Sequence, residues 1–152
     1  MAVKTSWRKK QIYFEDVNVG DETPSFSNTP DLMTLNWFAG ANRELAYIHM
    51  DRDYSKKIGL PDVIIMGNLK ANYIANMLDD WMGEGGRIFK LATQYRSMNV
   101  PEDTLIAKGK VTAKRHEDGK NLVELDVWVD DQKGIKNTIG SATVILPSHI
   151  GT

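Results

Sequence analysis

Cysteine is absent from the 152 residues of this sequence. Its absence excludes disulfide bonds, zinc sites with thiolate ligands and thiol nucleophiles, and it fits a reducing compartment. Neither sign of charge is in excess, because 19 basic residues stand against 20 acidic ones. The chain therefore lacks the broad positive field that nucleic acid or an anionic membrane surface requires, and an anionic ligand must be held locally.

Long hydrophobic runs are also missing. No stretch reaches the roughly 18 apolar residues of a membrane helix, and no apolar segment follows the basic residues of the N-terminus, MAVKTSWRKKQIYFEDV. We expect a cytoplasmic protein with neither membrane nor nucleic acid as a partner. A hydrophobic share of 41% and a charged share of 26% predict one globular domain, spanning residues 1–152.

Turn residues and short apolar pairs dominate the first part of the chain. Residues 13–30 predict an extended lead-in with turns and room for one edge strand. A helix-start signal at Thr29-Pro30-Asp31 then predicts a short helix in DLMTLNWFAGA that Gly40 can end. The residues expected near one side of this helix are Leu32, Leu35, Trp37 and Phe38. The stretch DRDYSKKIG predicts a helical turn closed by Gly59.

Residues 69–83, LKANYIANMLDDWMG, show the clearest helical period in the sequence. Apolar side chains cover two adjacent faces, and only a narrow stripe is polar. The stripe consists of Asn68, Asn72, Asn76 and Asp80. So wide an apolar surface predicts a helix that is mostly enclosed.

The remainder of the chain alternates with a period of two, which indicates β-strands. The alternating sets are Phe89, Leu91, Thr93 and Tyr95; Leu105, Ala107, Gly109 and Val111; Val123, Leu125, Val127 and Val129; and Ile139, Ser141, Thr143 and Ile145. HEDGK and DDQKG have hairpin-turn chemistry. We expect three or four long antiparallel strands in an α+β fold, a strongly bent sheet wrapped around the long central helix. Trp128 faces away from Val127 and Val129, where a homodimer contact could cover it.

Several segments, in the same order along the chain, resemble the MaoC-like family of single-hotdog acyl dehydratases. They are YFEDVNVGDETPSFSNTP, LNWFAGA, NRELAYIHMDRDYSKKIGLPDVIIMGNL, FKLATQYRSMNVPEDTLIAKGKV and GSATVILP. The resemblance implies a hotdog fold, with five or six antiparallel strands around a central helix, paired into dimers. It also implies R-specific hydration of 2-enoyl-CoA thioesters or the reverse dehydration, with no cofactor beyond the coenzyme A that carries the substrate.

The departures from the family pattern fall at the site. The family's hydratase motif has an aspartate five residues before a histidine; here His49 matches the histidine and Glu44 replaces the aspartate. Tyr47 stands where the family has a proline. In a second family motif, which resembles Ile-x-His-Gly-Met, Gly67 is kept and Met66 replaces the histidine.

Hydration of an enoyl thioester needs a base, a group that orients water and donors for the enolate oxygen. We expect Glu44 to be the base and His49 to hold the water. Backbone N–H groups at Gly67 and at the first turn of the helix from Asn68 would bind the thioester oxygen. The alternative for Glu44 and His49 is a polar loop that hydrogen-bonds helix ends.

Weaker candidates complete the expected site. Asn72 could face the acyl chain or fix a water, or belong to a polar stripe at a dimer contact. Arg96, Lys108 and Lys110 could meet the phosphates of coenzyme A, although such charges are commonly a solvated face. We expect no metal site, since His49, Asp51 and Asp53 alternate along an irregular segment with no second histidine close in sequence.

Two other functions fit the same residues. Hotdog proteins include thioesterases, which would polarise the carbonyl at the same helix start and attack it with water. The changed site residues also fit an accessory hotdog subunit that binds acyl-CoA or stabilises a catalytic MaoC-like partner in a heteromer.

Overall fold

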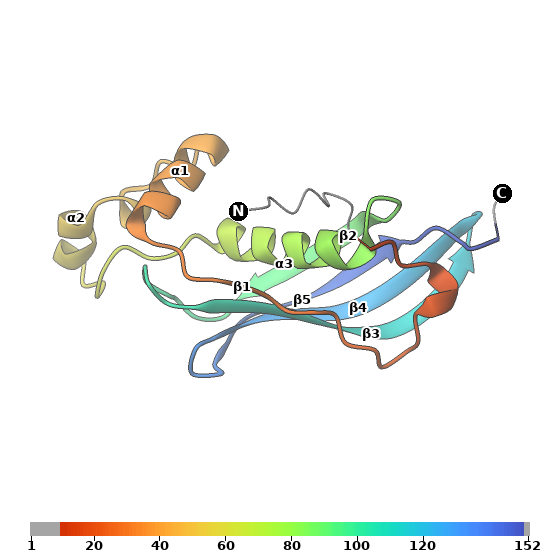
Figure 1. Ribbon diagram of the computed structural model, residues 1–152. Coiled ribbons are helices and arrows are strands. Elements are labelled where there is room, and N and C mark those ends of the chain that lie inside the picture. Colours follow the sequence, from red (N-terminus) through yellow and green to blue (C-terminus); the bar gives the residue numbers. More distant parts are fainter. Residues whose placement is uncertain (1–9, 151–152) are drawn as a thin grey trace, which may run out of the picture.

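The structure, a computed structural model, describes residues 10–150 of the chain. One antiparallel sheet with the strand order β1-β3-β4-β5-β2 curls around helix α3 (Figure 1). The strands are β1 (Phe26–Asn28), β2 (Arg87–Tyr95), β3 (Leu105–Glu117), β4 (Lys120–Asp131) and β5 (Lys136–Ile145). The helices are α1 (Leu32–Asn42), α2 (Arg52–Lys57) and α3 (Gly67–Met82), with 3-10 turns η1 (Phe14–Asp16) and η2 (Tyr47–His49). The predicted bent sheet around a central helix is confirmed.

Helix α3 lies at the centre because most of its circumference is apolar. Its buried residues are Leu69, Lys70, Tyr73, Ile74, Met77, Leu78 and Met82. Full burial of one large apolar side chain contributes roughly 1.5–3 kcal/mol, so the helix is anchored along its whole length. Asn68, Asn72, Asn76 and Asp80 are exposed, as the polar stripe predicts. Among residues 10–150, no helix has the length and apolar character needed to cross a bilayer.

Turn chemistry sets the register of the long hairpins. Asp118 and Gly119 join β3 to β4 with φ angles of 49° and 71°, the left-handed pair that matches the twist of a two-residue hairpin. Gly134 takes a φ of 77° in the next turn, where the Asp131 carboxylate accepts hydrogen bonds from the Lys133 and Ile135 amides. Both predicted hairpin turns are therefore confirmed.

In β5 and β2, the period-two alternation alone does not show which side chains are buried. In β5 the side chains of Thr138, Ala142 and Val144 are buried on the face opposite to the set beginning at Ile139, and Asn137 near the start of the strand is buried as well. The register explains this, because Ile139 pairs with Trp128 on the outer face of the sheet. In β2 an irregularity between Ile88 and Lys90 turns Phe89 outward, and 56% of Phe89 is exposed.

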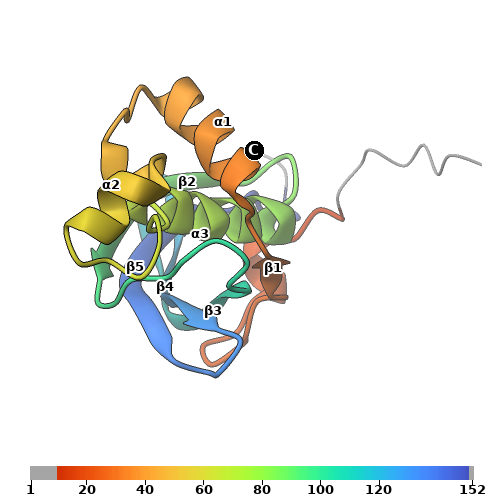
Figure 2. The ribbon, with the colours of Figure 1, turned by 90° about the vertical axis from the view of Figure 1, so that its left-hand side faces the viewer.

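Residues 31–66, which we call the overhang segment, contain α1, η2 and α2 and lie at the N-terminal end of α3 (Figures 1 and 2). The prediction that Trp37 shares a face with Leu35 is wrong: Trp37 is 72% exposed, whereas Leu35 and Ala39 are buried. Two residues along a helix correspond to a rotation of about 200°. Gly40 does not end the helix either; α1 continues to Asn42 and ends at Arg43, whose φ is 56°.

Candidate active site

His49 belongs to η2 and is nearly enclosed, with 7% of its surface exposed. Its Nδ1 lies 2.7 Å from the carbonyl oxygen of Ile64. A carbonyl only accepts hydrogen bonds, so Nδ1 carries the proton in the neutral ring and Nε2 is left as an acceptor. The Ile64 amide in turn donates to the carbonyl of Ile48 at 2.9 Å. This pair of contacts fixes both the orientation and the tautomer of the imidazole.

Glu44 follows the left-handed residue that ends α1, and its amide donates to the carbonyl of Ala39. Its Oε1 lies 3.7 Å from Nε2 of His49. Its Oε2 accepts hydrogen bonds from the side-chain amides of Asn42 and Asn68, each at 3.3 Å. A separation of 3.7 Å is too long for a direct hydrogen bond. Oε1 and Nε2 are therefore two acceptors that face each other across a short gap.

The start of α3 forms the third side of this site. The helix begins at Gly67 with no side-chain cap, so its first amides keep their donor capacity and carry the positive end of the helix dipole. Asn68, in the first turn, contacts Glu44 directly. A Cβ atom at residue 67 would meet the ring of Tyr95 at 2.4 Å. Glycine is thus required here for the ring of Tyr95 to lie against the helix start.

The candidate active site therefore brings together Glu44 from the loop after α1, His49 from η2, and Gly67 and Asn68 from the start of α3. The Glu44 carboxylate and the His49 imidazole lie side by side, and Asn68 links Glu44 to the start of α3, which no side chain caps. This arrangement can bind a water and stabilise a negatively charged oxygen.

A family model described as a MaoC like domain matches residues 18–133, which include every residue of this site. The chain belongs to the MaoC-like family. No curated protein sequence matches it.

Solved structures agree with this MaoC-like domain in fold. The (R)-hydratase from A. caviae involved in PHA biosynthesis is 22% identical, with 88% of this chain and 99% of that chain covered at a TM-score of 0.80. The R-hydratase PhaJ1 from Pseudomonas aeruginosa is 21% identical, with 91% and 88% covered at a TM-score of 0.83. The ChsH1-ChsH2 complex from Mycobacterium tuberculosis contains a chain that is 22% identical, with 85% and 98% covered at a TM-score of 0.75. The predicted hotdog fold is confirmed.

The weaker candidates are not drawn into the MaoC-like site. Asn72 is exposed one turn beyond Asn68, and its side chain accepts from Asn76 at 3.4 Å. Arg96 follows β2, whereas Lys108 and Lys110 lie on β3, and β4 and β5 separate these two strands. Strands are spaced about 4.8 Å apart, so β2 and β3 lie roughly 14 Å apart as measured along the curled sheet. The three basic residues do not form one phosphate-binding cluster, and Lys108 is paired with Asp130 at 3.0 Å.

Metal-ligand geometry is not found near His49. Asp51 caps α2 by accepting from the Tyr54 amide at 2.9 Å. Within residues 10–150, no three His, Cys, Asp or Glu side chains are grouped so that they could hold a metal ion.

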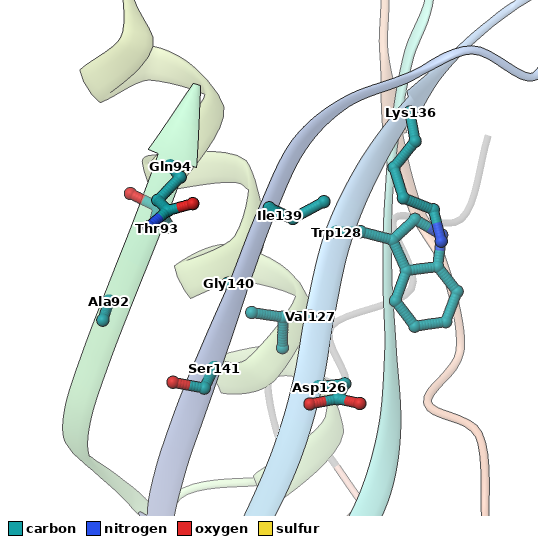
Figure 3. A pocket seen from close by; sticks show the side chains of 10 residues that line it. All are labelled: Ala92, Thr93, Gln94, Asp126, Val127, Trp128, Lys136, Ile139, Gly140 and Ser141. Atoms are coloured by element: carbon teal, nitrogen blue, oxygen red, sulfur yellow. The ribbon is translucent and has the colours of Figure 1, made fainter. Parts of the chain in front are cut away.

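The outer face of the sheet carries a separate hollow of about 540 Å³ (Figure 3). It lies over β2, β4 and β5, and the Nζ of Lys136 sits 4.5 Å from the centroid of the Trp128 ring. Trp128 therefore faces away from the core, as predicted, and Lys136 partly covers it. The hollow contains none of the predicted catalytic residues.

Sequence reasoning missed two residues beside the site, Tyr95 and Lys70. Tyr95 ends an alternating strand, and nothing in that pattern indicates its contact with Gly67. The sequence could have indicated Lys70, because it is a charged residue on the apolar part of a helix that is predicted to be enclosed. It is 2% exposed, and burial lowers the pKa of its ammonium group from 10.5 to about 8, although Asp103 opposes this shift.

The lowered pKa of Lys70 predicts an alkaline rise in stability. Between pH 8 and pH 10.5 the folded state has lost the Lys70 proton while the unfolded chain still holds it, so the free energy of unfolding increases with pH. The gain is on the order of 2 kcal/mol. Burial raises the pKa of Tyr73 from 10.0 to about 12, which reverses the trend above pH 10. Urea midpoints measured from pH 7 to 10 should rise, and in Lys70→Met this component of the rise should vanish.

Proposed function

We propose that this MaoC-like domain is an R-specific 2-enoyl-CoA hydratase that also catalyses the reverse dehydration of 3-hydroxyacyl-CoA. The observation that carries the proposal is the gap between Glu44 and His49 beside the uncapped start of α3. A water lying to one side of this contact, within hydrogen-bond distance of both atoms, can donate one hydrogen to Oε1 of Glu44 and the other to Nε2 of His49. Its oxygen lone pair is then free to attack the substrate.

The reaction proceeds in two balanced steps. Glu44 takes a proton as the water oxygen bonds to C3 of the enoyl thioester; the electron pair of the C2–C3 double bond then forms a C1–C2 double bond, and the carbonyl pair moves onto the thioester oxygen. Amides at Gly67 and Asn68 stabilise this enolate oxygen. C2 then takes the proton from the Glu44 carboxyl group, which regenerates the carboxylate. The reaction needs no cofactor beyond the coenzyme A that carries the substrate.

The replacement of the family's aspartate by Glu44 is compatible with this role. The side chain is one methylene longer, and an error of about an ångström can cost a hundredfold in rate. Here the carboxylate is fixed on one side by two amide donors, Asn42 and Asn68. These contacts hold Oε2 and leave Oε1 facing the imidazole. The longer side chain is therefore placed by its neighbours.

We further propose a homodimer as the working unit. Strand β2 is an edge of the sheet, and apolar side chains on it and just after it are exposed: Phe89 at 56%, Tyr95 at 47% and Met98 at 61%. Unpaired edges with exposed apolar groups favour association with a second chain.

The test is an assay of the purified chain with crotonyl-CoA and with a longer enoyl-CoA. Chromatography would separate hydrated thioester from free coenzyme A. We expect hydrated product of the R configuration and no free thiol above the uncatalysed level. Release of free thiol would identify a thioesterase and overturn the proposal.

An accessory subunit is the second candidate, and the exposed apolar residues of the overhang segment favour it. Trp37, Leu45 and Tyr47 are 72%, 66% and 63% exposed and lie on or near the elements that carry Glu44 and His49. A related MaoC-like partner could cover them. Such a subunit would be inactive alone and would support hydration only after mixing with that partner.

A further inference from the structure

Lys70 is a buried cation whose hydrogen bonds leave the core and reach the loop between β2 and β3. Its Nζ donates to the side-chain oxygen of Asn99 at 2.7 Å and to the carbonyl of Ser97 at 2.9 Å. Asn99 is itself only 4% exposed. The contact therefore joins the first turns of α3 to a loop 29 residues further along the chain.

Asn99 connects Lys70 to the segment that precedes α3. Its backbone carbonyl accepts from the amide of Ile65 at 2.8 Å, and its side-chain amide reaches Asp103 at 3.4 Å. Asp103 also accepts from the Val100 amide at 3.0 Å, which closes the loop on itself. The side chain of Asn99 thus binds Lys70, and the backbone carbonyl of Asn99 binds Ile65.

Ile65 stands between the two parts of the active site. Its neighbour Ile64 supplies the carbonyl that fixes His49, and Gly67 begins the helix two residues later. The hydrogen bond from the Ile65 amide to Asn99 is therefore made between the residue that orients the imidazole and the residue that begins α3.

Core packing alone does not explain a lysine at this position. An apolar side chain of similar length would fill the same volume without the desolvation of a charge, and such replacements are often neutral or stabilising. Desolvation is strong here, since the pKa of Lys70 falls to about 8. What the ammonium provides, and an apolar group cannot, is the pair of directed hydrogen bonds to the loop.

We propose that Lys70 is a positioning residue of the active site. By holding Asn99 it fixes Ile65, and through Ile64 and Gly67 it sets the distance between His49 and the helix amides that receive the enolate. The inference rests on the proposed hydratase function for its effect on rate, and on the structure alone for its effect on Ile65.

The test compares Lys70→Met with the wild-type chain in two independent measurements. In steady-state hydration of crotonyl-CoA, kcat should fall roughly ten- to a hundredfold while KM changes less than about threefold, because the ground-state contacts remain. In amide hydrogen exchange followed by NMR, the Ile65 amide should exchange at least about tenfold faster. The Leu125 amide in β4 should be unchanged. The urea midpoint at pH 7 should not fall in proportion to the loss of rate.

Lys114→Met is the matched control. This lysine also donates to a backbone carbonyl, that of Val17, but it lies near η1, which packs at the opposite end of α3. It should leave kcat and Ile65 exchange unchanged. Should Lys70→Met fail to fold, Lys70→Gln keeps a hydrogen-bond donor on a side chain one bond shorter and should show a smaller loss of kcat.

Each outcome decides the proposal. Unchanged exchange at Ile65 in a folded Lys70 variant overturns it, and so does faster exchange with an unchanged kcat. If the wild-type chain does not hydrate enoyl-CoA, the proposed function fails by itself. The exchange of Ile65 then still decides whether Lys70 positions the segment before α3.

Discussion

Glu44→Gln is expected to lower kcat for enoyl-CoA hydration by roughly a hundred- to ten-thousandfold, the range that a positioned general base supplies. Glutamine keeps the length of the side chain and an oxygen that can accept from Asn42 and Asn68. It cannot take a proton from water. KM should change little, because the thioester is bound by the start of α3. Steady-state kinetics with crotonyl-CoA would measure both constants.

Two further single variants and one double variant distinguish the role of the Glu44 carboxylate from that of the groups around it. Glu44→Asp keeps the proton acceptor but shortens it, so activity should remain well above that of Glu44→Gln. His49→Ala removes the second acceptor for the water and should also reduce kcat strongly, while the double variant with Glu44→Gln should lose little more than either single one. Full activity in Glu44→Gln would show that this carboxylate is not the base.

The central helix and the hairpins could be predicted from the sequence because they depend on short-range patterns. The polar stripe of Asn68, Asn72 and Asn76 specifies which side of α3 faces solvent. Asp118 and Gly119 adopt the left-handed conformations that a tight hairpin needs. These signals require no knowledge of distant partners.

Features that depend on pairing between distant segments were not predictable. The buried face of β5 follows from its register with β4, and the outward turn of Phe89 follows from a local irregularity against β5. Arg96 and Lys108 do not form one cluster because strand order, which the sequence does not state, places two strands between them. A charge pattern within one strand carries no information about which strands are neighbours.

The site was predictable only in part for the same reason. Glu44 and His49 are close in sequence, and their proximity in space follows from a short connection. Lys70 and Asn99 are 29 residues apart, and no local pattern links a lysine on a helix to an asparagine in a loop. The contact between Gly67 and Tyr95 is likewise a product of the way β2 passes the start of α3.

Gly140→Ala is expected to destabilise the fold by about 3 kcal/mol, at the upper end of the usual cost of overpacking. A Cβ atom on Gly140 would lie 2.1 Å from the carbonyl oxygen of Ala92 in the neighbouring strand. This oxygen belongs to the backbone of β2, so relief requires the two strands to separate locally, not merely a side chain to rotate. Urea unfolding followed by circular dichroism would measure the loss.

Gly40→Ala is the matched control, because it makes the same substitution in α1, where no atom beyond the adjacent residues and the backbone of the helix itself lies within 4 Å of the added Cβ. It should be neutral or stabilise by roughly 0.5–1 kcal/mol, as expected inside a helix. Equal urea midpoints for the two variants would contradict the close approach of β2 and β5. Because β2 ends at Tyr95, which lies against Gly67, separation of these strands should also disturb the helix start. Gly140→Ala should therefore lower kcat even at temperatures where the chain remains folded.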